Sequence, residues 1–179
     1  MAEIEIRPAV STDITVLEGF DHTCETTYVW QINNQTTKDH IFYDLREVRL
    51  PRVLRLNYPR RADSLKDTWT QHSLFLVARC DGNLVGYLIL DEKPDLKSAV
   101  IRDIVVDLPS RRQGIATALI LAAKDWLKKL GVTRLVLEVP AKNHPTIELM
   151  RKLRFNFSGL ADNYYANNEI AFFYVHLLN

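Results

Sequence analysis

The sequence has few cysteines and no long apolar run. Its two cysteines, Cys24 and Cys80, are too few for a disulfide framework and do not form a C-x-x-C pair. We expect both to be reduced in a cytoplasmic protein. No run of about 18 apolar residues is present, so we expect no membrane-spanning segment. The N-terminus lacks the basic region and apolar run of a signal peptide.

An excess of charge of either sign is also absent. The 23 Lys and Arg residues nearly balance the 22 Asp and Glu residues, which leaves a net charge of +1. This balance gives no electrostatic support for a nucleic-acid or membrane partner. The histidines, at positions 22, 40, 72, 144 and 176, do not have metal-ligand spacing, so we predict no metal site.

The 179 residues are enough for one domain with a sizeable core. Apolar alternation predicts a strand around Ile4 and Ile6, and Ser11 marks the start of a helix. From residue 74 onward the pattern is clear and mixes strands with helices. We expect strands at 74–79, 84–90, 99–106, 134–139 and 170–178, with helices at 114–130 and 145–153. The last strand is nearly all apolar, which indicates burial on both faces.

Residues 21–72 are harder to interpret. Two short apolar segments, Tyr28–Ile32 and Ile41–Tyr43, are candidate strands around the polar stretch 33–39. Pro51 and Pro59 are expected to break regular structure in the rest of this segment.

The sharpest feature is the segment Arg111–Thr117, where a strand leads through a loop into a long helix. The first N–H groups of a helix lack intrahelical acceptors, and the helix dipole is positive there, so such a site binds phosphate. Gly114 has no side chain and lets a pyrophosphate approach the backbone, while Arg111 and Arg112 add positive charge. An ordinary strand-to-helix turn with exposed arginines is the alternative. The loop is neither a Walker motif nor a dinucleotide fingerprint, because it contains a single glycine.

Several segments, in the right order over residues 74–178, resemble the GNAT acyltransferase superfamily. Arg111-x-x-Gly114-x-Ala116 is similar to the superfamily signature [QR]-x-x-G-x-[GA]. Leu137–Asn143 resembles its strand-to-Asn segment, and Ile147–Phe155 its "I-x-L-Y-x-K-L-G-F" helix. Residues 164–174 resemble the tails of ribosomal-protein alanine acetyltransferases and streptothricin acetyltransferases.

The resemblance implies a single α/β domain, residues 1–179, with a mixed, mostly antiparallel central sheet flanked by helices. Residues 74–178 would form the cofactor-binding core and residues 21–72 the acceptor side. The co-substrate would be acetyl-CoA. Its contacts would be the strand Ile104, Val105 and Val106, the loop residues Arg111, Arg112, Gln113, Gly114, Ile115, Ala116 and Thr117, and Asn143 near the pantetheine. Asn143 is equally suited to capping a helix.

The resemblance also implies direct attack of an amine on the thioester. Glu138 lies at the position of the family's catalytic base, although strand alternation also allows a solvent-facing side chain there. The backbone N–H of Val106 would meet the oxyanion. Met150 occupies the position where the family usually has a Tyr that acts as the general acid for the leaving thiolate. Tyr164 and Tyr165 are the candidate substitutes for this acid.

On the acceptor side, Tyr28 and Trp30 are candidate substrate contacts, or otherwise strand core. We therefore predict an N-acetyltransferase that acts on a primary amine of a protein, an antibiotic or a small metabolite. A catalytically degenerate acyl-CoA-binding sensor and a nucleotide-binding module are the alternatives. The sequence leaves the oligomeric state open, a homodimer included.

Overall fold

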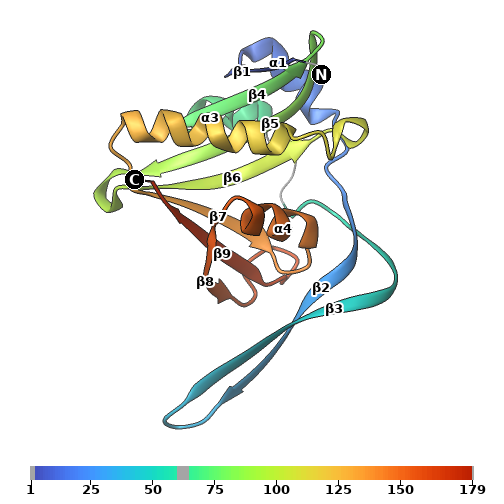
Figure 1. The fold of residues 1–179 in the computed structure, drawn as a ribbon, viewed down its shortest axis with the longest axis vertical. Coiled ribbons are helices and arrows are strands. Elements are labelled where there is room, and N and C mark those ends of the chain that lie inside the picture. Colours follow the sequence, from blue (N-terminus) through green and yellow to red (C-terminus); the bar gives the residue numbers. More distant parts are fainter. Residues whose placement is uncertain (1–2, 60–64, 179) are drawn as a thin grey trace.

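The computed structural model describes residues 3–59 and 65–178 (Figure 1). Its strands are β1 (Ile4–Pro8), β2 (Cys24–Thr36), β3 (Ile41–Leu56), β4 (Leu74–Cys80), β5 (Asn83–Lys93), β6 (Ser98–Val106), β7 (Arg134–Pro140), β8 (Asn156–Ala161) and β9 (Ala171–Leu177). Its α-helices are α1 (Ser11–Glu18), α2 (Leu65–Thr68), α3 (Ile115–Lys129) and α4 (His144–Lys152). Short 3-10 turns occur at η2 (Trp69–Gln71), η3 (Pro94–Leu96) and η4 (Leu108–Ser110).

Seven strands form one sheet in the order β1-β4-β5-β6-β7-β9-β8. Neighbouring strands are antiparallel except for β6 and β7, which run parallel. A parallel pair needs a crossover connection, and α3 supplies it. The predicted fold class, a mixed and mostly antiparallel sheet flanked by helices, is confirmed.

Helices cover both faces of this sheet. On one face, α3 packs its buried stripe against the larger core cluster, to which α4 contributes Ile147 and Met150. The spacing of that stripe, Ile115, Leu119, Ile120, Ala123 and Leu127, is that of an amphipathic helix. The other face carries a smaller cluster that includes side chains of α1, α2 and Val105 of β6.

Gly86 in β5 allows α3 to start close to the sheet. A Cβ at this position would lie 2.9 Å from the carbonyl oxygen of Val105 and 3.1 Å from Cγ2 of Ile115. Both distances are shorter than a normal contact, so a side chain would push the first turn of α3 outward. The glycine thereby fixes the height of the helix terminus above β6.

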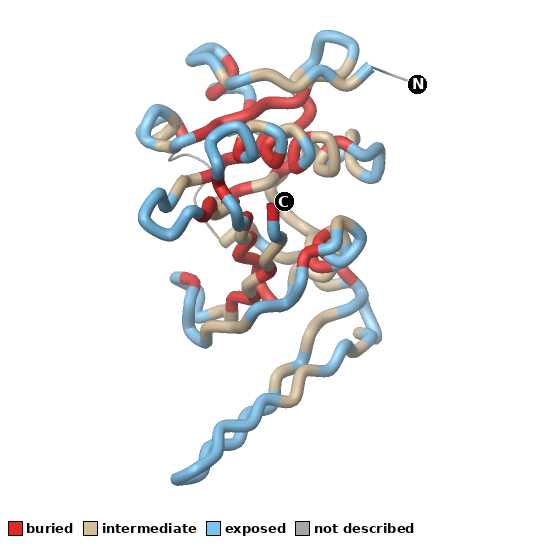
Figure 2. The backbone as a smooth tube through the Cα atoms, turned by 60° about the vertical axis from the view of Figure 1, so that its left-hand side comes forward, coloured by how far each residue is buried: buried red, intermediate tan, exposed pale blue. Residues whose placement is uncertain are grey.

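Strands β2 and β3 form a long ribbon, which we call the arm (residues 24–56), and it projects away from the seven-stranded sheet (Figure 1). Near the body, Trp30, Ile32 and Leu45 pack against the larger core. The far end is exposed (Figure 2). Ile41 in this part of the arm has 70% of its surface exposed. The two short strands expected from the sequence are therefore parts of much longer ones.

The prediction that Pro51 breaks the chain is wrong, because β3 runs through it. The pairing register explains the difference. Arg49 pairs with Tyr28 and Leu54 with Thr26, so residues 50–53 face Thr27 alone in an irregular bulge. Proline has no backbone N–H, and it is tolerated in a bulge because no ladder hydrogen bond is required from that residue.

Two further points differ from the sequence expectations. The edge strand β8 was not predicted, and it pairs with β9. Strand β9 is buried at Ala171, Phe172 and Tyr174, but Leu177 is 60% exposed, so burial on both faces does not extend to its end. In the described part of the chain, no helix is long and apolar enough to cross a membrane.

Candidate active site

A cleft opens where β6 and β7 separate. Their parallel ladder joins Ser98–Ile101 to Arg134–Leu137, and beyond it the two strands pair only with their outer neighbours. The cleft has a volume of about 680 Å³ and is lined by Ile104–Val106 on one side and by Pro140 and α4 on the other.

The pairing of β5 with β6 sets the direction of the free backbone groups. The N–H of Asp107 donates to the carbonyl of Val85, which makes the next pair, Gly86 and Val106, a non-hydrogen-bonded one. The N–H and C=O of Val106 therefore point away from β5, toward the cleft. The same alternation applies to Ile104, which is paired with Leu88.

The start of α3 forms one lip of the cleft. Gly114 is the N-cap, with φ of 87°, and Arg112 before it also has a positive φ of 67°. The first intrahelical bond runs from the N–H of Ala118 to the carbonyl of Gly114, so the N–H groups of residues 115–117 have no acceptor within the helix. This is the geometry of an anion site. Of the predicted cofactor contacts, all but Gln113 line the cleft.

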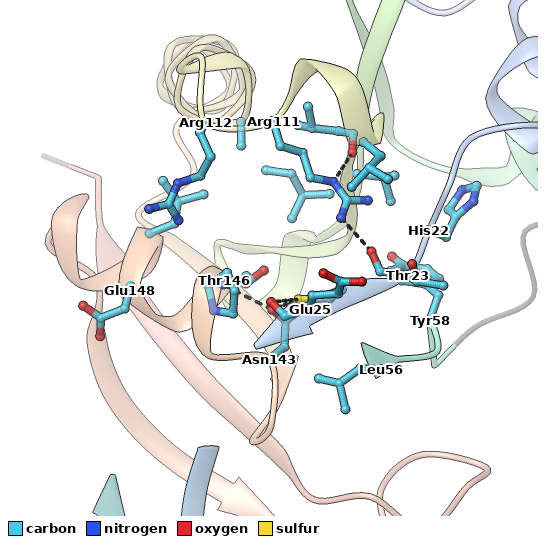
Figure 3. A pocket seen from close by; sticks show the side chains of 18 of the residues that line it. His22, Thr23, Glu25, Leu56, Tyr58, Arg111, Arg112, Asn143, Thr146 and Glu148 are labelled. Carbon is cyan, nitrogen blue, oxygen red and sulfur yellow. Dashed lines mark hydrogen bonds between the residues drawn. The ribbon is translucent and has the colours of Figure 1, made fainter. Parts of the chain in front are cut away.

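Arg111 adopts an orientation that the sequence did not predict. Its guanidinium donates to the carbonyl oxygens of Val106 (2.8 Å) and Thr23 (2.7 Å) (Figure 3). It also donates to the carbonyl oxygen of Asp21 (2.5 Å). Arg112, in contrast, is exposed on the lip of the cleft. The two neighbouring arginines therefore differ in what they contact.

The opposite lip is the start of α4. Asn143 caps this helix, because its Oδ1 accepts from the N–H of Thr146 at 3.2 Å. The same oxygen lies 3.4 Å from Sγ of Cys24, which reaches across from the start of β2. Asn143 also lines the cleft, so the two roles expected for it are compatible. Burial raises the pKa of the Cys24 thiol.

Polar and aromatic side chains that the sequence did not single out line one end of the cleft. His22 and Tyr58 lie there, away from Glu148 (Figure 3). His22 Nδ1 lies 2.7 Å from the carbonyl of Phe20 and Nε2 lies 3.0 Å from the hydroxyl of Tyr87. A carbonyl only accepts, so Nδ1 carries the proton. Burial lowers the pKa of His22, which favours the neutral ring.

Two carboxylates accompany these rings. The hydroxyl of Tyr58 donates a hydrogen bond to the carboxylate of buried Asp103 in β6. Glu25 lines the cleft from the start of β2, is exposed, and has no ion pair within the described residues. No signal in the sequence identified these residues, because the polar contacts join residues far apart in the chain.

Glu138 lies on β7 and is buried, with 9% of its surface exposed. The solvent-facing orientation that alternation allowed is therefore wrong. Its Oε2 accepts from the hydroxyl of Tyr164 at 2.5 Å. Leu137 and Val139 point into the larger core, so Glu138 faces the opposite side of the sheet, as does Asp103 two residues before Val105. Glu138 does not line the cleft itself.

Tyr165, a candidate for the general acid, and Met150, at the family's usual position for that acid, are both buried. Tyr165 is buried and its ring lies edge-on to that of Tyr164 at 5.2 Å. Met150 is fully buried in the larger core. A thioether is at best a weak acceptor, so this position supplies no acid.

Tyr28 and Trp30 lie outside the cleft. Tyr28 stacks on His144 with ring centroids 5.2 Å apart, and Trp30 packs edge-on against Phe172. Arg151 of α4 lies 5.0 Å from the centre of the Trp30 ring. These contacts favour the packing role that the sequence also allowed, and they join the base of the arm to α4.

Charged groups reinforce this junction. Glu47 of β3 bonds to His144, and these two with Glu148 form the one acidic and histidine cluster among the described residues with metal-compatible spacing. Arg151 already supplies the positive charge, at 2.6 Å from Glu148 and 3.9 Å from Glu47. The cluster is therefore an ion-pair network.

Comparison with known proteins identifies the family. Residues 40–155 match the model of the acetyltransferase (GNAT) family. The chain belongs to this family. The resemblance found in the sequence is confirmed, and the chain is an acetyl-CoA-dependent N-acetyltransferase. A structurally similar protein of Bacillus anthracis str. Ames (19% identity, TM-score 0.75, 98% of this chain and 99% of that one) was solved in complex with acetyl coenzyme A.

Among the relatives, streptothricin acetyltransferase of Streptomyces lavendulae is 29% identical over 161 residues, which cover 87% of this chain and 83% of that one. The ribosomal protein bS18-alanine N-acetyltransferase of Escherichia coli K12 is 39% identical over 85 residues, 48% of this chain and 53% of that one. The crystal structure of nourseothricin acetyltransferase superposes with a TM-score of 0.84 at 25% identity, over 98% and 99% of the two chains.

Proposed function

We propose that this GNAT N-acetyltransferase acetylates a primary amine of a streptothricin-type antibiotic in the cleft between β6 and α4. The observation that carries the proposal is the chemistry of the acceptor end. There the carboxylate of Glu25 lines the cleft together with the rings of His22 and Tyr58, and buried Asp103 accepts a hydrogen bond from the Tyr58 hydroxyl. Carboxylates and aromatic rings favour a cationic ligand. Residues 21–72 would supply most of this wall.

The cofactor would occupy the other end. The pyrophosphate of acetyl-CoA would bind the free N–H groups at the start of α3, beside Arg112, and the pantetheine would pair with the backbone of Ile104 and Val106. The separation of β6 from β7 supports this arrangement, because β6 has no strand partner on that side beyond Ile101, although the carbonyl of Val106 accepts a hydrogen bond from Arg111. The Val106 N–H would then stabilise the oxyanion.

The reaction needs a free amine. An amine with a pKa of about 10 is protonated at neutral pH and must lose its proton before it attacks the thioester. Glu138 is the proposed base. Because it does not line the cleft, it would act through a water molecule, and its position on the same sheet face as Asp103 supports this role. The neutral amine then adds to the thioester carbonyl, which forms the N–C bond and the oxyanion. As the oxyanion collapses the C–S bond breaks, the nitrogen loses its second proton to solvent, and the thiolate takes a proton from water.

The alternatives are weaker. The likeness to the ribosomal-protein enzyme covers about half of each chain, whereas the streptothricin enzyme is matched along most of its length. The comparisons give no support to a degenerate sensor, since the named relatives are acetyltransferases.

An acceptor panel tests the proposal. Release of the free CoA thiol is followed with a streptothricin mixture, spermidine, free amino acids and a peptide with an N-terminal alanine, each at several concentrations. We expect the highest kcat/KM with streptothricin. A higher value for the peptide would assign the enzyme to protein amines instead, and CoA binding without turnover of any amine would favour the sensor.

A further inference from the structure

Arg111 belongs to the family signature, but its side chain turns away from the cofactor end of the loop. Three of its nitrogens donate to backbone carbonyls, one on β6 and two in the segment that precedes β2. A guanidinium offers five N–H donors in a rigid planar fork, which suits several fixed acceptors at once. The orientation of the Arg111 guanidinium therefore suits binding to backbone carbonyls rather than to a phosphate.

The segment that Arg111 holds is residues 21–25, which forms part of the acceptor wall. It carries His22, Cys24 and Glu25, all of which line the cleft. Its contacts with β6 and the loop after that strand are otherwise slight, since the N–H of Asp21 reaches Oδ1 of Asp107 at 3.4 Å. Among the described residues, Arg111 is thus the main polar link between residues 21–25 and the cofactor strand.

The far end of the same segment is attached to the other lip of the cleft. Cys24 Sγ contacts Asn143, the cap of α4, at 3.4 Å. The segment therefore bridges the two lips, with Arg111 fixing one end. Arg111 Nε also holds the carbonyl of Val106, whose N–H points into the cleft. One side chain thus connects the acceptor wall to the residue nearest the proposed oxyanion.

We propose that Arg111 is a positioning residue for the acceptor, not a contact of the cofactor pyrophosphate. The inference rests on the proposed function for the identity of the acceptor. Arg111 acts through residues 21–25, which it holds against β6, so that Glu25 and His22 face the amine. Lys cannot replace it, because a single ammonium cannot span three separate carbonyls.

Arg112 provides a matched control. It is adjacent in the sequence, carries the same charge, and lies exposed on the cleft lip. Arg111→Lys keeps the positive charge of the loop but removes the guanidinium that bonds to three carbonyls. Arg112→Gln removes a positive charge and leaves the Arg111 guanidinium with its three hydrogen bonds. The two variants therefore separate a positioning effect from a loss of positive potential at the phosphate site.

The experiment measures the KM for streptothricin, the Kd for CoA by calorimetry, and amide hydrogen exchange over residues 21–25. For Arg111→Lys we expect the amine KM to rise about tenfold or more, because several hydrogen bonds are lost. The Kd for CoA should stay within about threefold, and exchange at residues 21–25 should become faster. For Arg112→Gln the pattern should be reversed, with weaker CoA binding and unchanged exchange.

Two results would overturn the inference. One is an Arg111→Lys protein in which CoA binding weakens while the amine KM is unchanged, which would make Arg111 a phosphate contact. The other is unchanged exchange at residues 21–25. If wild-type protein fails to acetylate streptothricin at all, the proposed function fails, but the CoA affinity and the exchange still decide the role of Arg111.

Discussion

The hydroxyl of Tyr164 donates a hydrogen bond to the carboxylate of Glu138 over 2.5 Å. Tyr164 comes from the turn between β8 and β9, and Glu138 from the middle of β7, so the contact joins the last turn of the fold to the proposed base. The hydroxyl proton is thereby directed at a carboxylate rather than at a leaving sulfur. This arrangement favours a role for Tyr164 as the hydrogen-bond partner of the proposed base over a role as the general acid for the leaving thiolate.

Replacing Glu138 with Gln should lower kcat by about 100-fold or more, within the range for loss of a general base. The deficit should be largest at low pH and shrink as the pH approaches the pKa of the amine, about 10, where the acceptor is already deprotonated. A pH–rate profile measured at saturating substrates checks this. The CoA affinity serves as the control for folding. A profile identical to that of the wild type would remove Glu138 from the mechanism.

Tyr164→Phe and Tyr165→Phe should each lower kcat by less than about 100-fold, because a thiolate with a thiol pKa near 8.5 leaves without an enzymic acid. The Tyr164 variant should be the more affected, since it loses the hydrogen bond to Glu138. Turnover at saturating donor and amine gives the comparison. A loss above about 100-fold in a variant that still folds and binds CoA would identify that tyrosine as the acid.

Gly114→Glu should abolish CoA binding, because a carboxylate would occupy the anion site at the start of α3. The matched control is Gly131→Glu, since Gly131 follows the C-cap of the same helix. It has a similar positive φ of 72°, against 87° for Gly114, and an added Cβ meets no atom within 4 Å at either site. The backbone strain is therefore comparable.

Calorimetric titration with CoA should find binding in the Gly131 variant and none in the Gly114 variant. Equal CoA affinity in the two folded proteins would place the pyrophosphate elsewhere.

Asp13→Asn should lower the free energy of unfolding by about 1–3 kcal/mol at neutral pH, because Asp13 is buried and accepts two hydrogen bonds from Arg7, at 2.7 and 2.8 Å. The Arg7 guanidinium holds the pKa of Asp13 below its ordinary value. The stabilisation is therefore present above the unfolded pKa of about 3.9 and is lost as the pH falls through the folded value.

Urea unfolding of wild type and variant at pH 7 and near pH 3 measures this difference. The difference in free energy of unfolding between the two proteins should be smaller at the lower pH. A difference that is unchanged or larger in acid would contradict the assignment.

The sequence was sufficient to predict the loop and helix that begin at Gly114, because their signals are local. Gly114 and the long helix after it are neighbours in the chain, and the apolar spacing from Ile115 to Leu127 specifies which face is buried. The mixed α/β class followed from the order of such segments, and the mostly antiparallel sheet from the family resemblance. The strand limits of the arm did not, because the bulge at residues 50–53 depends on cross-strand register, which Pro51 alone does not reveal.

The proposed acceptor end of the cleft could not be predicted either, because its contacts join residues that are far apart in the chain. Tyr58 and Asp103 meet across 45 residues, and Arg111 reaches back 90 residues to Asp21. Trp30 and Tyr28 stood out in the sequence as large aromatic residues, but side-chain direction on the twisted arm turns them toward α4. Contacts of this kind arise from tertiary packing and leave no periodic signal.

The central claim is that the cleft between β6 and α4 is the acetyl-CoA site, and a crystal structure of the wild-type protein with CoA tests it most directly. The account predicts density for the pyrophosphate against the N–H groups of residues 114–117 and for the pantetheine along Ile104–Val106, with the Arg111 guanidinium still on the carbonyls of Asp21 and Thr23. CoA bound away from the start of α3, or Arg111 turned onto the phosphates, would contradict it.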